Sequence, residues 1–183
     1  VFLPLFGEHQ AENAATALAA VEAFFGAGPD RMLDPELIRA GFAAVDNPGR
    51  LERLSSSPTV IVDAAHNGHG GRALAQSITS EFDFKRLVAV VAMLDGKDAD
   101  AFLAALEPDV EEVVVTRTAS ARAMELAELA RIAEERFTSQ RVHVVETLPD
   151  AVSAALDLVG VPDPTGDDDV SGVGVLVTGS LVT

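Results

Sequence analysis

The run Asp63–Asn67 (DAAHN) places a carboxylate, an imidazole and an amide directly after a short apolar segment at residues 59–62. If that segment is a buried strand, Asp63 stands at its carboxyl end, where a carboxylate can accept hydrogen bonds from ribose hydroxyls. Three glycines at positions 68, 70 and 71 would let the backbone approach a ligand closely. Capping of the next helix by Asp63 or Asn67 explains the same spacing equally well. The run alone predicts only a polar ligand at a strand end.

Three further polar residues could take part in binding. Arg50 follows a Pro-Gly turn and could clamp phosphate, because guanidinium pairs bidentately with phosphate oxygens; an exposed hinge arginine paired with Glu52 has the same signature. Asn13, a poor helix former in an Ala-rich segment, is either a surface residue or an amide that reads the edge of a base. Ser180 lacks the GxSxG context of a nucleophile, so we expect a hydroxyl donor to a ligand or a turn residue.

The sequence does not predict a metal site. His9, His69 and His143 include no pair spaced i, i+4 on one helical face. The acidic triplet at 167–169 belongs to a polar segment at 162–172 and is interpreted as a solvated loop. Lys97, between a glycine and an aspartate, is interpreted as an ion-paired turn residue.

Composition excludes several classes of protein. With 29 acidic and 13 basic residues the net charge is −16, which disfavours nucleic-acid and anionic-membrane partners. Trp and Tyr are absent, so aromatic platforms for stacked bases are few. The absence of Cys excludes disulfides and thiol chemistry and fits a cytoplasmic setting. No apolar stretch is long enough to span a membrane.

Short apolar segments alternate with helical ones along most of the chain. This alternation predicts an α/β fold with a mostly parallel, doubly wound, Rossmann-like sheet. Strands are expected at 59–62, 87–91, 113–115, 142–145 and 173–177, and helices at 71–80, 98–106, 120–137 and 149–159. Two earlier helices are expected at 8–25 and from Asp34-Pro35 to about Gly41, with a turn-rich boundary at 46–49. Residues 1–5 look like a strand already in progress, which suggests a fragment.

Five motifs in this order resemble folylpolyglutamate synthase/dihydrofolate synthase, a branch of the Mur ligase superfamily. They are Gly7–Ala15 (GEHQAENAA), Pro48–Glu52 (PGRLE), Asp63–Asn67 (DAAHN), Met93–Asp98 (MLDGKD) and Thr178–Leu181 (TGSL). Two positions depart from the family pattern. Gly68 stands where the family usually has Pro, and Gly96 stands where it usually has the first Asp of Asp-Lys-Asp.

The resemblance implies a division of the chain into two parts. Residues 1–46 would be the helical tail of a central ATPase domain, and residues 47–183 the Rossmann-like C-terminal domain of a Mur-type ligase. No GxxxxGK[ST] motif occurs in the 183 residues. The P-loop, the Mg²⁺ ligands and most of the folate site are therefore expected in a preceding ATPase domain outside this chain, and a monomer is expected.

The reaction implied by the resemblance is ATP-dependent amide formation. ATP would phosphorylate a carboxylate of folate or dihydropteroate, and the amine of L-glutamate would attack the acyl phosphate. By resemblance Asn13 would contact adenine, Arg50 the phosphates and Asp63 the ribose. His66, as the catalytic residue, and Ser180 would hold the glutamate, while the isolated chain would be inactive and bind nucleotide at most weakly. A Mur-type ligase acting on a peptidoglycan precursor and a non-catalytic α/β ligand-binding module remain alternatives.

Overall fold

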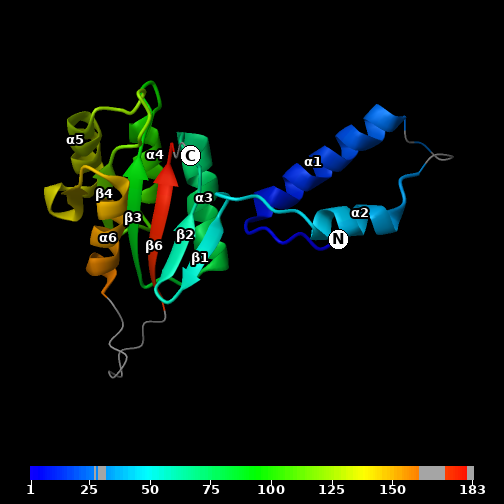
Figure 1. The fold of residues 1–183 in the computed structure, drawn as a ribbon, viewed down its shortest axis with the longest axis horizontal. Helices are drawn as coiled ribbons and strands as arrows, with labels where there is room; N and C mark the ends of the chain where they lie inside the picture. Colours follow the sequence, from blue (N-terminus) through cyan, green and yellow to red (C-terminus); the bar gives the residue numbers. More distant parts are fainter. Residues whose placement is uncertain (27, 29–31, 161–171, 181–183) are drawn as a thin grey trace.

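The computed structural model describes residues 1–26, 28, 32–160 and 172–180, and these form a sheet domain with a helical arm (Figure 1). The sheet has six strands in the order β1-β2-β6-β3-β4-β5. Neighbouring strands from β2 to β5 are all parallel, and β1 pairs with β2 in antiparallel fashion at one edge. The strands are β1 (Glu52–Ser56), β2 (Thr59–Val62), β3 (Arg86–Ala92), β4 (Glu112–Thr116), β5 (Val142–Val144) and β6 (Val173–Gly179).

Helices cover both faces of the sheet, as a doubly wound fold requires. On one face lie α3 (Gly68–Glu81), α4 (Ala99–Leu106) and α5 (Leu126–Phe137), which is followed by the short 3₁₀ helix η1 (Ser139–Arg141). On the other face lies α6 (Leu148–Val159). The central strands are apolar almost throughout because both of their faces are buried, which is typical of parallel sheets. The predicted α/β, mostly parallel, doubly wound architecture is confirmed.

The helix expected at 120–137 begins only at Leu126. The preceding residues instead pair with the segment that follows β3: Met124 donates its N–H to the carbonyl of Met93 at 2.9 Å, and Asp95 donates to the carbonyl of Arg122 at 2.7 Å. Met124 is therefore buried through a backbone pairing rather than through a helical face. Apolar spacing cannot separate these two cases, because it reports burial and not the element that causes it.

One further expectation at the amino-terminal side was wrong, and one strand was missed. No strand forms over residues 1–5, and the turn-rich boundary is followed by β1, which the sequence did not predict. β1 is short, polar and at the edge of the sheet, so it lacks the apolar run that marks the central strands. The predicted polar loop containing residues 167–169 lies outside the described residues.

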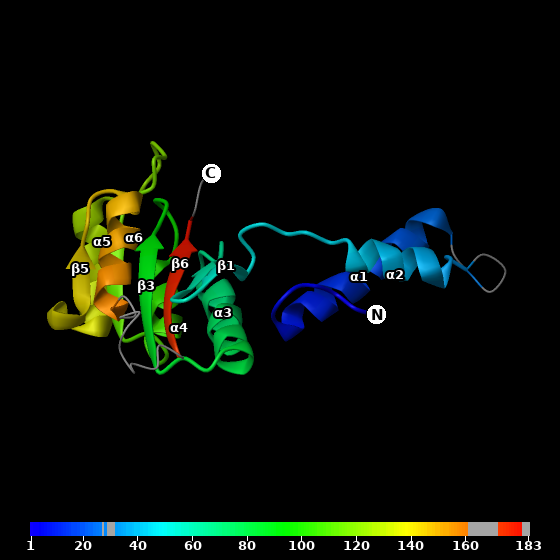
Figure 2. The ribbon, with the colours of Figure 1, turned by 60° about the horizontal axis from the view of Figure 1, so that its bottom comes forward.

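The helical arm consists of α1 (Glu8–Phe25) and α2 (Pro35–Ala43), and it projects away from the sheet (Figures 1 and 2). The Asp34 carboxylate accepts from the N–H of Glu36 at 2.8 Å, so the Asp-Pro start of α2 is confirmed. Only the first turns of α1 approach the sheet domain, where His9 Nδ1 lies 3.4 Å from Ser77 Oγ of α3. Apolar side chains such as Phe24 (84% exposed) and Leu37 (72% exposed) face outward. No helix in the described part of the chain is both long enough and apolar enough to cross a membrane.

The end of β6 packs directly against the end of β3. Gly179 has φ 105°, and a Cβ built there would lie 2.1 Å from the carbonyl oxygen of Ala92. The same carbonyl accepts the N–H of Ser180 at 2.8 Å. This contact therefore requires a residue without a side chain, both for its backbone angle and for its distance to β3.

We expect Gly179→Ala to destabilise the fold by more than the roughly 1–3 kcal/mol that backbone strain alone costs, since the added methyl also overlaps a carbonyl. Urea unfolding followed by circular dichroism measures this loss. Gly96→Ala is the matched control, because Gly96 also has a positive φ of 76° but has nothing within 4 Å of the position that a Cβ would occupy. An equal loss of stability in the two variants would contradict the close β3–β6 contact.

Candidate functional site

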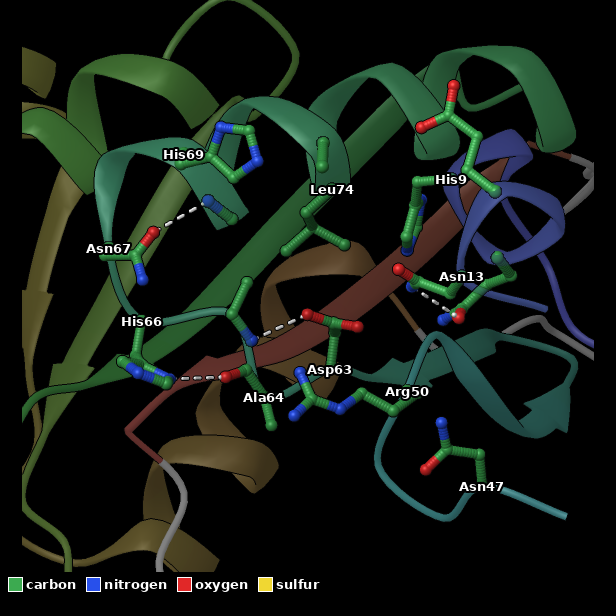
Figure 3. Close-up of a pocket in the computed structure, with 15 residues that line it drawn as sticks. His9, Asn13, Asn47, Arg50, Asp63, Ala64, His66, Asn67, His69 and Leu74 are labelled. Atoms are coloured by element: carbon green, nitrogen blue, oxygen red, sulfur yellow. Dashed lines mark hydrogen bonds between the residues drawn. The ribbon is translucent and has the colours of Figure 1, made fainter. Parts of the chain in front are cut away.

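A cavity of about 520 Å³ opens at the carboxyl end of β2 (Figure 3). Its wall is formed by the β2–α3 turn, the loop before β1 and the first turns of α1. Parallel α/β sheets bind ligands at this end of their strands, so the cavity lies where the fold predicts a site. The polar side chains on its wall include His9, Gln10, Asn13, Arg50, Asp63 and His66.

The Asp63 carboxylate joins two segments of the wall. Its Oδ2 accepts the N–H of Leu51 at 2.9 Å, and its Oδ1 accepts the N–H of Ala65 at 2.7 Å. A backbone bond from the N–H of Ala64 to the carbonyl of Gly49, at 2.9 Å, runs beside them. Asp63 thus fastens the loop that carries Arg50 to the end of β2, and does not cap α3.

The pKa of Asp63 results from opposing effects. Burial raises the pKa above its ordinary value of 3.8, while the N–H groups of Ala65 and Leu51 and the electrostatic effect of Arg50 and His9 partly offset that increase. Because the folded state then holds the proton more tightly than the unfolded chain, this group contributes most stability below pH 3.8. Its contribution falls as the pH rises through the raised pKa.

Arg50 is exposed and belongs to the cavity wall rather than to an ion pair with Glu52. The Glu52 carboxylate instead accepts the N–H of Gly49 at 2.8 Å and so helps to shape the turn. The guanidinium of Arg50 lies on the same side of the cavity as Asp63 (Figure 3). In a protein with a net charge of −16, this arrangement provides a local cation that can pair with an anionic ligand.

His66 is held in one tautomer by its own turn. Its Nδ1 lies 2.8 Å from the carbonyl oxygen of Ala64, and because a carbonyl can only accept, Nδ1 carries the proton. In the neutral ring the lone pair of Nε2 is then available at the cavity. The side chain is half-buried, so this nitrogen can accept a proton or a hydrogen bond from a ligand.

Asn67 caps helix α3, and two of the three glycines, Gly68 and Gly71, lie where α3 packs against α4. The Asn67 Oδ1 accepts the N–H of Gly70 at 2.8 Å, so the capping interpretation is correct for Asn67. A Cβ at Gly68 would lie 2.9 Å from Cβ of Ala101, and one at Gly71 would lie 3.1 Å from the Phe102 ring. These two glycines let α3 pack closely on α4. Of the three, only Gly70 lines the cavity.

Ser180 lies apart from the other predicted residues. Asn13, Arg50, Asp63 and His66 come together on one cavity wall, whereas Ser180 is not among the residues that line it. The Ser180 hydroxyl is buried, with 6% of the residue exposed, and has no hydrogen-bond partner in the described part of the structure.

The other polar candidates lie outside the cavity. The Asp98 carboxylate caps α4 by accepting the N–H of Ala101 at 2.9 Å. Lys97 was expected to be an ion-paired turn residue, but it forms no ion pair with a described residue and does not line the cavity. His143 Nε2 lies 2.6 Å from a carboxylate oxygen of Glu112. No group of three or more His, Asp or Glu side chains suited to a metal ion occurs among the described residues.

Sequence reasoning missed His9 and Gln10 as parts of the cavity wall. Both belong to the Gly7–Ala15 motif, in which only Asn13 was singled out. Gln10 is the one buried residue of α1, and a buried glutamine in an otherwise exposed helix indicates a specific contact. That burial is a tertiary property, so the helical pattern alone could not reveal it.

Fold and site together define a doubly wound α/β domain with a polar cavity at the strand ends. Residues 49–181 match the family described as Mur ligase, glutamate ligase domain. The chain belongs to this family.

Relatives of known structure or activity are similar over nearly the whole chain. The Mycobacterium tuberculosis protein named dihydrofolate synthase/folylpolyglutamate synthase is 54% identical over 188 aligned positions, covering 100% of this chain and 38% of the relative. A crystal structure of M. tuberculosis folylpolyglutamate synthase complexed with ADP and AMPPCP matches with a TM-score of 0.89 and 53% identity, covering 98% of this chain and 39% of that chain. A bifunctional folylpolyglutamate synthase/dihydrofolate synthase with Mn, AMPPNP and L-glutamate bound matches with a TM-score of 0.74 and 30% identity, covering 97% of this chain and 38% of that one.

We expect Asp63→Ala to loosen the loop that carries Arg50. The change leaves the N–H groups of Leu51 and Ala65 without acceptors, and each orphaned buried donor costs about 1–3 kcal/mol. Amide hydrogen exchange at Leu51 should become faster, and the free energy of unfolding should fall. Asp98→Ala is the control, since it removes one exposed helix cap worth about 1 kcal/mol and should leave exchange at Leu51 unchanged. Exchange at Leu51 as slow in Asp63→Ala as in the original protein would refute this role.

Proposed function

We propose that this chain forms one wall of the active site of an ATP-dependent ligase that adds L-glutamate to a folate carboxylate. The proposal rests on one observation: Arg50, Asp63 and His66 line the same cavity as the amide side chains of Gln10 and Asn13 in α1. Support comes from the relatives, which are named folylpolyglutamate and dihydrofolate synthases. The absence of Cys in the 183 residues supports a reducing, cytoplasmic setting.

The chain spans 38% of the length of its M. tuberculosis relative, so the proposed reaction needs further polypeptide. We assign residues 1–46 to an ATPase domain and residues 47–183 to the Rossmann-like domain. Two observations support this division: the family match begins at residue 49, and the arm exposes apolar side chains. An apolar groove of about 390 Å³ between α1 and α2, lined by residues such as Leu18, Val21 and Phe42, is the kind of surface that another domain would bury.

In this proposal ATP occupies the cavity with its phosphates on Arg50, its ribose on Asp63 and its adenine on Asn13. The exposed guanidinium suits phosphate oxygens, and each carboxylate oxygen of Asp63 keeps a free lone pair beside the backbone N–H that it already accepts. A relative is complexed with ADP and AMPPCP, which supports the assignment. A divalent metal would require ligands elsewhere, since the described residues hold no suitable cluster.

The proposed chemistry proceeds in two balanced steps. A carboxylate oxygen of the folate attacks the γ-phosphorus of ATP, the bond to ADP breaks, and an acyl phosphate forms. The glutamate amine then attacks the acyl carbon, phosphate leaves, and the amine loses a proton. Because Nδ1 of His66 donates its hydrogen bond to Ala64, Nε2 is free and would accept the proton that the amine loses. The unpartnered Ser180 hydroxyl would help to hold glutamate, which would account for its burial without a partner.

In the longer ligase that contains this chain, we expect Arg50→Ala to impair the use of ATP more than that of glutamate. Loss of charge-assisted hydrogen bonds worth about 1.5–3 kcal/mol corresponds to a decrease of roughly ten- to a hundredfold in kcat/KM for ATP. Steady-state kinetics with dihydropteroate or folate measure it, and Arg53→Ala, an exposed arginine of β1, is the matched control. Unchanged ATP dependence would reject the phosphate assignment, and activity with a UDP-muramyl substrate instead of folates would reject the proposed substrate.

The isolated 183-residue chain should show no ligase activity.

Substitutions at His66 and Ser180 should act on glutamate. His66→Asn keeps an N–H that can donate to the Ala64 carbonyl but lacks the second ring nitrogen, so we expect a raised KM for glutamate and a lower kcat. Ser180→Ala should raise the KM for glutamate with a smaller effect on kcat. The KM for ATP, measured in the same variants, is the internal control and should change little. Glutamate kinetics equal to those of the unmodified enzyme in both variants would remove these residues from the glutamate site.

A further inference from the structure

Leu51 has a backbone conformation that leucine rarely adopts. Its φ is 48°, and among the described residues other than glycine only Thr138 also has a positive φ. This left-handed conformation is unfavourable for an L-residue because Cβ comes too close to the following carbonyl oxygen. Leu51 directly follows Arg50 and is only 2% exposed. A strained residue of this kind persists only where the surrounding contacts hold it in place.

Three attachments hold Leu51 in this conformation. Its N–H donates to Asp63 Oδ2 at 2.9 Å. Its side chain belongs to the apolar core on the face of the sheet that α3, α4 and α5 cover. The next residue, Glu52, begins β1 and pairs with Val62 of β2. A negative φ at Leu51 would rotate these attachments relative to one another, so the left-handed backbone is what allows all three to form together.

The segment before Leu51 is the part that a change in this backbone would move. On the far side of Leu51, β1 is paired along its length with β2. On the near side lies the turn at 47–50, in which the N–H of Arg50 donates to the carbonyl of Asn47 at 3.2 Å. Arg50 is exposed and lines the cavity, whereas Leu51 does not (Figure 3). Relaxation at Leu51 would therefore shift the guanidinium of Arg50 and leave the sheet in place.

We propose that Leu51 is a positioning residue, whose left-handed backbone and buried side chain hold the guanidinium of Arg50 on the cavity wall. The inference rests on the proposed function, in which Arg50 binds the phosphates of ATP. Leu51 touches no phosphate in this proposal and acts only through Arg50. An arginine whose backbone is already fixed loses less conformational entropy when it binds an anion, so the strain at Leu51 favours phosphate binding.

Substitutions at position 51 separate backbone conformation from burial. Isoleucine has the same side-chain atoms as leucine, but its branched Cβ makes the left-handed conformation more costly. Methionine is close in size and unbranched at Cβ, so Leu51→Met keeps both features. Leu87→Ile is the matched control, because Leu87 is also 2% exposed, belongs to the same core and lies in β3 without a positive φ. Leu51→Ala removes the buried anchor without branching Cβ and provides a second test.

The experiment measures kcat/KM for ATP in the longer ligase that contains this chain, for each variant with and without Arg50→Ala. We expect Leu51→Ile to lower this constant by roughly three- to tenfold and Leu51→Ala to lower it as well. Leu51→Met and Leu87→Ile should retain most of it, and the KM for glutamate should change little in all of them. Thermal unfolding followed by circular dichroism shows that each variant is folded at the assay temperature.

Combination with Arg50→Ala provides a readout that a purely structural role of Leu51 would not change. If Leu51 acts through Arg50, substitutions at Leu51 should have little further effect once the guanidinium is absent. If Leu51 only stabilises the core, the same substitutions should lower kcat/KM by the same factor in both backgrounds.

The outcomes distinguish the inference from the proposed function. Unchanged ATP kinetics in Arg50→Ala would overturn the phosphate assignment, and the role of Leu51 with it. An effect of Arg50→Ala together with Leu51→Ile kinetics equal to those of Leu51→Met would overturn only the role of Leu51, as would equal factors in the two backgrounds. A loss in Leu51→Ile that disappears in the presence of Arg50→Ala would establish that role.

Discussion

The site depends on the buried carboxylate of Asp63, which accepts one backbone N–H from each of two segments. Without it, the loop at 49–51 would have little to fix its position relative to the end of β2, because the other bond between them in the described structure is that from Ala64 to Gly49. The same loop carries Arg50, so the position of the cation is set by an anion that lies beneath it. Burial works against this arrangement by raising the pKa of Asp63, and the two N–H donors, together with Arg50 and His9, oppose that effect.

Local electrostatics here run against the global charge. A net charge of −16 would repel a phosphate from most of the surface, yet the cavity presents an exposed guanidinium that no carboxylate side chain neutralises by a direct ion pair in the described structure. Glu52, the nearest acid in sequence, is occupied by the N–H of Gly49. Because the Glu52 carboxylate is hydrogen-bonded to the backbone of its own turn, the guanidinium of Arg50 remains available for a ligand.

Most of the sheet could be predicted from sequence because parallel strands buried on both faces are short, continuous apolar runs. The segments around β2, β3, β4 and β6 have that pattern. The pattern failed where burial comes from other causes. Met124 fits the helical spacing although it lies in a backbone pairing with Met93, and β1 is a polar edge strand that pairs only with β2 among the described strands, so it lacks the apolar run of the central strands.

The sequence by itself determined the alternation of strands and helices, the polar turn at Asp63–Asn67 and the resemblance in five ordered motifs, since these depend on residues close together in the chain. Only the tertiary structure decided that Asp63 accepts the N–H of Leu51 while Asn67 caps α3. It also decided that the glycines at 68 and 71 allow α3 to pack against α4, and that Gln10 lines the cavity beside Asn13. Each of these outcomes depends on which group lies opposite a side chain in space. Spacing along the chain cannot specify that, because a carboxylate or a glycine fits several partners equally well until the fold brings one of them within contact.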